Sequence, residues 1–143
     1  EGVHLCEDIS LRLTALEATH REMVDLADVI TAILKSRLQQ RISELLQDLH
    51  AFDENRFQME VAVLADRADI HEELTRLDSH FRQFRRSLSQ DGAVGRKLDF
   101  LLQEMNREAN TIGAKAAQTE MTEHVIAMKT QLEKIREQVQ NIQ

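Results

Sequence analysis

Two short stretches of the 143-residue chain carry acidic and histidine side chains at spacings that would gather them on a helix. The first contains three carboxylates, an arginine and a histidine at successive steps of three, four, three and four residues: Asp66, Asp69, Glu73, Arg76 and His80. On one continuous helix, these steps place all five side chains on one face. Carboxylate oxygens favour Mg²⁺ or Mn²⁺, and an added imidazole favours Mn²⁺ or another transition metal. The same pattern also fits an ordinary solvated helix face, so spacing alone leaves both interpretations open.

The second stretch contains Glu104 and Glu108, one helical turn apart. Like charges at this spacing destabilise a helix by about 0.2–0.5 kcal/mol, which a bound cation or a neighbouring arginine would offset. Asn106 and Asn110 lie in the same stretch, although asparagine is only a moderate helix former. A helix built only for packing would more often use Ala, Lys, Gln or Glu at such positions. Ordinary surface polarity is the alternative explanation.

A basic cluster lies between the two acidic stretches and could contact a phosphate backbone. Its members are Arg82, Arg85, Arg86, Arg96 and Lys97. Five cations within sixteen residues could hold RNA through bidentate hydrogen bonds and counterion release. Ion pairs with the many carboxylates of neighbouring helices would account for the same residues.

The sequence lacks the common signatures of other catalytic sites. Gly92 and Gly95 are not followed by the Gly-Lys-Ser/Thr of a phosphate-binding loop, and no Cys-x-x-Cys pair, dinucleotide fingerprint or Ser-His-Asp arrangement occurs. Cys6 is the only cysteine, so it cannot form an internal disulfide, and we expect an unreactive thiol. His71 lies on an apolar stripe, where we expect a packing or interface role.

The composition predicts that long helices position these groups. The chain has no proline, four glycines and no aromatic residue other than five Phe, so it is poorly supplied with residues for turns and strands. The formal net charge of −7 excludes a global basic field for nucleic acid or anionic lipid. No apolar run approaches the roughly 20 residues of a membrane-spanning helix. We expect an all-α protein with a cytoplasmic location and no membrane partner.

Apolar residues at steps of three and four predict a first helix over residues 5–50. No breaker interrupts it, and such a length requires an antiparallel neighbour or another subunit along the apolar face. A second helix follows Asp53, whose carboxylate can cap it. Asp69 and Glu72 resemble a capping box, so a kink or restart near Asp69 would fit the sequence.

A glycine-marked loop over residues 89–95 separates the second helix from a third, which we expect to begin near Gly95 and to end near Gly113. The last helix carries apolar residues at alternating steps of four and three over residues 121–142, which is typical of a coiled-coil seam. The expected architecture is a hairpin or bundle of long antiparallel helices, packed in a homo-oligomer.

Three ordered motifs resemble those of the bacterial YicC/YloC family of endoribonucleases. They cover residues 60–80, residues 95–113 with the core Gln-Glu-Met-Asn-Arg-Glu, and residues 132–142. The departures are small: Ala114 stands where serine is usual, His71 where a small residue is common, and Gln143 where glutamate is usual. Residues 1–50 resemble the long connecting helix of the family only in their pattern.

The resemblance implies a cytoplasmic, divalent-metal-dependent endoribonuclease that acts on RNA, assembles as a homohexamer and has other RNA-decay proteins as candidate partners. It divides the chain into a connecting helix, residues 1–50, and a C-terminal helical domain, residues 51–143, and it implies that the N-terminal α/β half of the family is absent.

Together with the spacing argument, the resemblance favours a cation, Mn²⁺ or Mg²⁺, bound by Asp66, Asp69, Glu73, His80, Glu104 and Glu108. We predict that Glu104 and Glu108 are the catalytic pair and that Arg107 joins the basic cluster in binding RNA. The alternative is an oligomerisation and RNA-docking scaffold whose catalytic groups lie in the missing half or in a partner nuclease.

Overall fold

The computed structural model describes residues 2–48, 53–90 and 95–142. The described part contains five helices: α1 (Gly2–Gln47), α2 (Glu54–Ala68), α3 (His71–Leu88), α4 (Gly95–Lys115) and α5 (Thr119–Ile142). It contains no strand, which confirms the predicted all-α class. None of the described helices is both long enough and apolar enough to cross a membrane.

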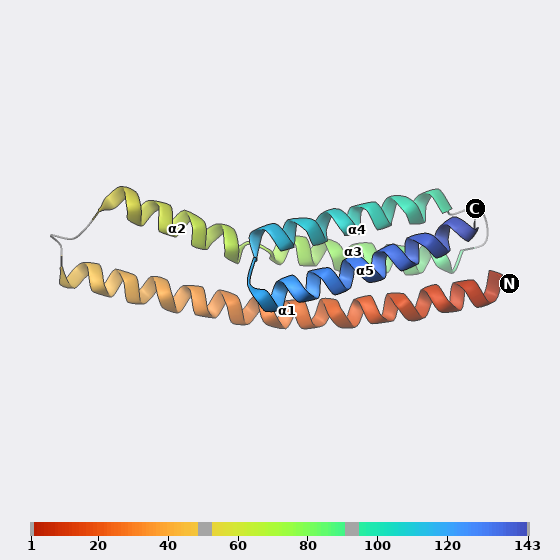
Figure 1. Ribbon diagram of the computed structural model, residues 1–143, viewed down its shortest axis with the longest axis horizontal. Helices are drawn as coiled ribbons and strands as arrows, with labels where there is room; N and C mark the ends of the chain where they lie inside the picture. The colour runs from red at the N-terminus through yellow and green to blue at the C-terminus, as the bar shows by residue number, and fades with distance from the viewer. Residues whose placement is uncertain (1, 49–52, 91–94, 143) are drawn as a thin grey trace.

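Four of the helices pack around one core. Figure 1 shows α3, α4 and α5 lying along the N-terminal half of α1, while α2 lies along its C-terminal half. Within this four-helix bundle, α1 and α4 each contact both α3 and α5. The largest buried side chains include Leu13 of α1, Phe81 and Phe84 of α3, and Met105 of α4. Because α3 and α4 share this core, side chains at the edge of their contact are held at a defined register.

The long first helix is confirmed, and it takes part in two different environments. Its apolar stripe is buried at three- and four-residue steps as far as Leu34, as an amphipathic helix requires. After Leu34, no residue of α1 is buried among those described. Residues 35–47 and α2 form a two-helix arm, which extends beyond the four-helix bundle (Figure 1).

The chain restarts between α2 and α3, so the first acidic stretch does not lie on one continuous helix. α2 ends at Ala68 and α3 begins at His71. Ile70 occupies the N-cap position of α3 with no side-chain capping hydrogen bond, and its side chain is buried. The restart that the sequence allowed near Asp69 is present, so the single second helix expected up to the glycine-marked loop is wrong. The capping box is wrong as well. Burial of Ile70 takes its place in anchoring the turn.

The cap predicted for the second helix is present. The backbone N–H of Arg56 donates to Oδ1 of Asp53 at 3.2 Å, which satisfies one of the free amides of the first turn. The apolar residues predicted for the last helix are buried: Met121, Val125, Met128, Leu132, Ile135 and Val139. Part of the predicted loop, residues 91–94, and the break near residues 49–52 lie outside the described residues, as does Gln143.

Two predictions about single residues need correction. The third predicted helix does end near Gly113, but Gly113 is not its C-terminal cap, because α4 continues to Lys115. A Cβ at Gly113 would lie 3.3 Å from Cγ1 of Val125, so the glycine permits close packing of α4 on α5. His71 is not packed within this chain, because its side chain is 52% exposed and its Nε2 lies 4.0 Å from Oδ1 of Asp28. The interface role that the sequence also allowed stays a prediction.

The buried histidine of the bundle is His20, which the sequence pattern did not single out. Its Nε2 lies 2.7 Å from the backbone oxygen of Leu74, and its ring meets that of Phe81 edge to face. Since a backbone oxygen can only accept a hydrogen bond, the proton of the ring lies on Nε2. His20 therefore ties α1 to α3 inside the core.

Candidate metal centre

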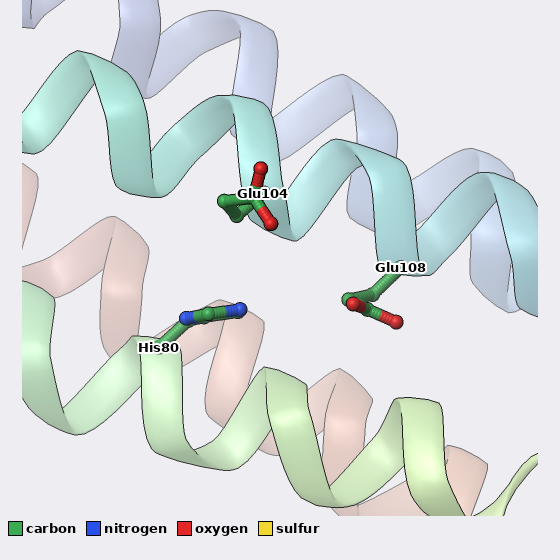
Figure 2. Close-up of side chains that lie close together, drawn as sticks. All are labelled: His80, Glu104 and Glu108. Atoms are coloured by element: carbon green, nitrogen blue, oxygen red, sulfur yellow. The ribbon is translucent and has the colours of Figure 1, made fainter.

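Three of the predicted ligands come together between α3 and α4. His80 of α3 and Glu104 and Glu108 of α4 each offer one ligand atom, and these atoms lie within 4.8 Å of one another. Figure 2 shows the His80 ring extending from α3 into the space between the two helices, with both carboxylates extending from α4. Among the described residues, no other group of three or more His, Cys, Asp or Glu side chains is this close.

The register of the two helices explains why these residues meet. The helices α3 and α4 run in opposite directions (Figure 1). Arg76 and His80 are one turn apart on α3, and Glu108 and Glu104 are one turn apart on α4. Arg76 lies opposite Glu108, so one turn along α3 and one turn back along α4 bring His80 opposite Glu104.

The donor set suits a divalent cation. Two carboxylates and one imidazole supply oxygen and nitrogen ligands of the kind that Mn²⁺ accepts. Nδ1 of His80 is buried and has no hydrogen-bond partner among the described residues, which is costly for a polar atom that coordinates nothing. Glu104 likewise forms no hydrogen bond or ion pair within the described part of the chain. Three protein ligands would leave coordination positions for water or substrate.

Glu108 differs from the other two ligands because it is buried against a counter-charge. Its side chain is 8% exposed, and its Oε1 accepts from Nε of Arg76 at 2.8 Å. This hydrogen bond raises the pKa of the Arg76 guanidinium above its ordinary value, with burial acting in the opposite direction and the charges of Glu108 and Glu72 raising it further. The sequence predicted that a cation or an arginine would offset the repulsion between Glu104 and Glu108. Arg76 is an arginine in that position, because it pairs with Glu108, although the spacing argument assigned it no function.

The other predicted ligands do not join this group. Oε1 of Glu73 accepts from Nζ of Lys115 at 2.9 Å, and it also lies 3.5 Å from Nη2 of Arg76. Asp69 is exposed, and its backbone oxygen accepts from Nζ of Lys115 at 3.2 Å. The side chain of Asp66 lies outside the described part of the structure.

The basic cluster divides into residues held by the fold and residues free to bind a ligand. Arg85 donates to Ser10 and Thr14 of α1 at 3.1 and 2.9 Å, and it pairs with Glu17. Arg82 pairs with Asp78 on its own helix. The remaining four cations are exposed and form no ion pair with another described residue: Arg86, Arg96, Lys97 and Arg107.

Comparison with known proteins places this chain in a family. Residues 23–143 match the family described as endoribonuclease YicC-like, C-terminal. Two curated relatives, from Clostridioides difficile and Haemophilus influenzae, are named probable endoribonuclease YicC and are 45% and 35% identical to the chain. Both alignments cover 100% of this chain and 49% of the relative, so the chain spans about half the length of the curated relatives it matches. The chain therefore belongs to the YicC-like endoribonuclease family and carries its C-terminal region.

Proposed function

We propose that this chain supplies the metal centre of a divalent-metal-dependent endoribonuclease whose substrate is RNA. The observation that carries the proposal is the meeting of His80, Glu104 and Glu108 across two helices, with a buried imidazole nitrogen that lacks a partner among the described residues. Membership of the family supports the reaction class, because its curated relatives are named probable endoribonucleases. Mn²⁺ or Mg²⁺ is the proposed cation.

The chain's own residues would divide the work of phosphodiester hydrolysis. His80, Glu104 and Glu108 would hold the cation, which when bound would stabilise the charge that develops on the phosphoryl oxygens and lower the pKa of a bound water. The side chain of Arg107 is exposed and follows Glu104 by three residues, on the same side of α4, where it would hold a phosphate near the centre. Three further cations would bind the RNA backbone: Arg86 near the C-terminal end of α3, and Arg96 and Lys97 near the N-terminal end of α4.

The test is cleavage of a structured RNA in the presence of Mn²⁺, Mg²⁺ or EDTA. We expect chelation to abolish cleavage and Glu104→Gln and Glu108→Gln each to lower the rate at least about 100-fold, by analogy with other preorganised charged groups. Glu137→Gln is the matched control, because Glu137 is an exposed glutamate on α5. Undiminished cleavage by both site variants would remove this centre from the mechanism.

The alternative function is an oligomerisation and RNA-docking scaffold whose catalytic groups lie elsewhere. The two-helix arm favours it: an open groove of about 840 Å³ runs between α1 and α2, lined in part by Leu38, Met59 and Val63. Exposed apolar surface of this kind marks protein interfaces, and a homohexamer is the assembly we propose. Running the cleavage assay in parallel on this chain and on the two relatives separates the functions, since cleavage by the relatives alone would favour the scaffold.

A further inference from the structure

A line of alternating charges runs along the contact between α3 and α4, next to the candidate metal centre. Arg76 lies at its middle: Nη1 donates to Oε1 of Glu72 at 2.5 Å, and Nε donates to Oε1 of Glu108 at 2.8 Å. Lys115 of α4 donates to Glu73 of α3 at 2.9 Å. Each helix therefore supplies a cation to a carboxylate of the other helix.

The carboxylates that accept from Arg76 and Lys115 across the two helices are buried. The side chain of Glu73 is 4% exposed and that of Glu108 is 8% exposed. Burying a carboxylate is costly unless a counter-charge lies against it. Arg76 supplies that charge to Glu108 and Lys115 supplies it to Glu73, although Oε2 of Glu73 has no hydrogen-bond partner among the described residues. Only Glu108 also belongs to the group with His80 and Glu104.

We propose that Arg76 is a positioning residue of the metal centre, which fixes Glu108 so that the carboxylate meets an incoming cation in one orientation. This inference rests on the proposed function. The Nε–H of Arg76 occupies Oε1 of Glu108, and no described residue donates a hydrogen bond to Oε2. Glu72 holds the other end of the same guanidinium, so the planar group cannot rotate freely and the carboxylate keeps its direction.

Charge alone and orientation of Glu108 predict opposite changes in cation affinity when Arg76 is removed. A guanidinium beside the site repels a second cation, so its removal would tighten cation binding if charge were all that mattered. If orientation of Glu108 dominates, its removal weakens binding, because losing a partner that orients a ligand typically costs about 10–100-fold in metal affinity. The sign of the change therefore decides between the two roles.

The experiment is a titration of the purified chain with Mn²⁺ alone. Electron paramagnetic resonance measures the free Mn²⁺ at each step, which gives the dissociation constant. Arg76→Gln removes the charge and the guanidinium fork. Lys115→Gln is the matched control, because it also removes one positive charge from the network but from a side chain that contacts Glu73. Circular dichroism and thermal unfolding check each variant, and Arg76→Lys provides a milder change if Arg76→Gln does not fold.

We expect Arg76→Gln to raise the dissociation constant for Mn²⁺ about 10–100-fold. Arg76→Lys should raise it by a smaller factor. Lys115→Gln should change it less than about threefold, because this substitution leaves Glu108 oriented. Unchanged or tighter binding by either Arg76 variant would overturn the inference and leave the proposed function intact, as would equal weakening by Lys115→Gln. If the unmodified chain does not bind Mn²⁺, the proposed metal centre fails, and the inference fails with it.

Discussion

At the residue scale, the charged groups of α3 differ in what holds them. Arg76 pairs with three carboxylates, Glu72, Glu73 and Glu108, and the rise in its pKa follows mainly from its hydrogen bond to Glu108. A cationic group whose pKa is raised on folding contributes stability that is fully present below its unfolded pKa and is lost only as the pH rises through the folded value. Both values lie in the strongly alkaline range for a guanidinium, so Arg76 adds no pH dependence to stability near neutrality.

Glu73 is expected to act in stability, not in cation binding. Glu73→Gln removes a buried charge and its ion pair with Lys115, and we expect a loss of about 1–3 kcal/mol in the free energy of unfolding. The dissociation constant for Mn²⁺ should change less than about threefold, because Glu73 is not one of the three proposed ligands and contacts Arg76 only at 3.5 Å, whereas the hydrogen bond from Arg76 to Glu108 is retained. Urea denaturation and the Mn²⁺ titration measure the two quantities. A tenfold loss of affinity at unchanged stability would return Glu73 to the ligand set.

Arg85 and Arg86 are adjacent arginines with opposite expected roles. Arg85→Ala should lower stability by about 1–3 kcal/mol, since it removes charge-assisted hydrogen bonds from α3 to α1. Arg86→Ala should leave stability within about 0.5 kcal/mol. If Arg86 contacts phosphate, its removal should reduce the slope of log affinity for single-stranded RNA against log salt by about 0.7. Filter binding at several salt concentrations gives the slope, and the opposite assignment of the two effects would contradict this division.

At the element scale, the contact between α4 and α5 depends on a residue without a side chain. Gly113→Ala would gain about 0.8–1.0 kcal/mol in helix propensity, but its Cβ would lie 3.3 Å from the buried Val125. We expect crowding to cancel that gain. In a Val125→Ala background, the effect of Gly113→Ala on the free energy of unfolding should be more favourable by about 1 kcal/mol. This difference lies within the range of coupling energies for residues in contact. A double-mutant cycle by urea denaturation measures this coupling, and strictly additive effects would show that the contact is not tight.

The helices could be predicted from sequence because burial on an amphipathic helix follows a local period. The break at residues 69–70 could be suspected, but its cause is burial of Ile70, a tertiary contact. The predicted stripe holds on α3 for Leu74, Leu77, Phe81 and Phe84, which are buried. It fails at His71, the first residue after the break. Gly113 was misassigned because close packing of two helices uses glycine as readily as a helix end does.

The candidate site shows the same division between local and tertiary information. Spacing within each helix identified Glu104 with Glu108 and placed Arg76 one turn from His80. It could not supply the register between α3 and α4, which decides that Arg76 meets Glu108 and that Glu73 meets Lys115. The sequence did show that the faces of α3 and α4 carry complementary charges, which is a signal that they pair. Only the packing of the two helices shows which residues form each pair.

At the scale of the whole molecule, the four-helix bundle and the two-helix arm differ in how completely they bury their apolar surface. The bundle encloses a continuous core, whereas none of the described side chains over residues 35–48 and 53–65 is buried. Two helices alone leave much of their apolar area in water. α1 is one uninterrupted helix through both parts, so it connects the arm to the bundle without a hinge loop. A surface for assembly requires such a defined position.

We therefore expect the arm to carry the contacts of the proposed homo-oligomer. Met59→Glu would place a charge in an apolar interface, which costs several kcal/mol unless the charge finds a partner, and it should lower the molar mass measured by light scattering. Ile126→Glu is the matched control, because Ile126 is an exposed apolar residue of α5 in the bundle, 59% exposed. A fall in mass for Ile126→Glu but not for Met59→Glu would place assembly on the bundle. Metal affinity should survive in both variants, since neither position adjoins His80, Glu104 or Glu108.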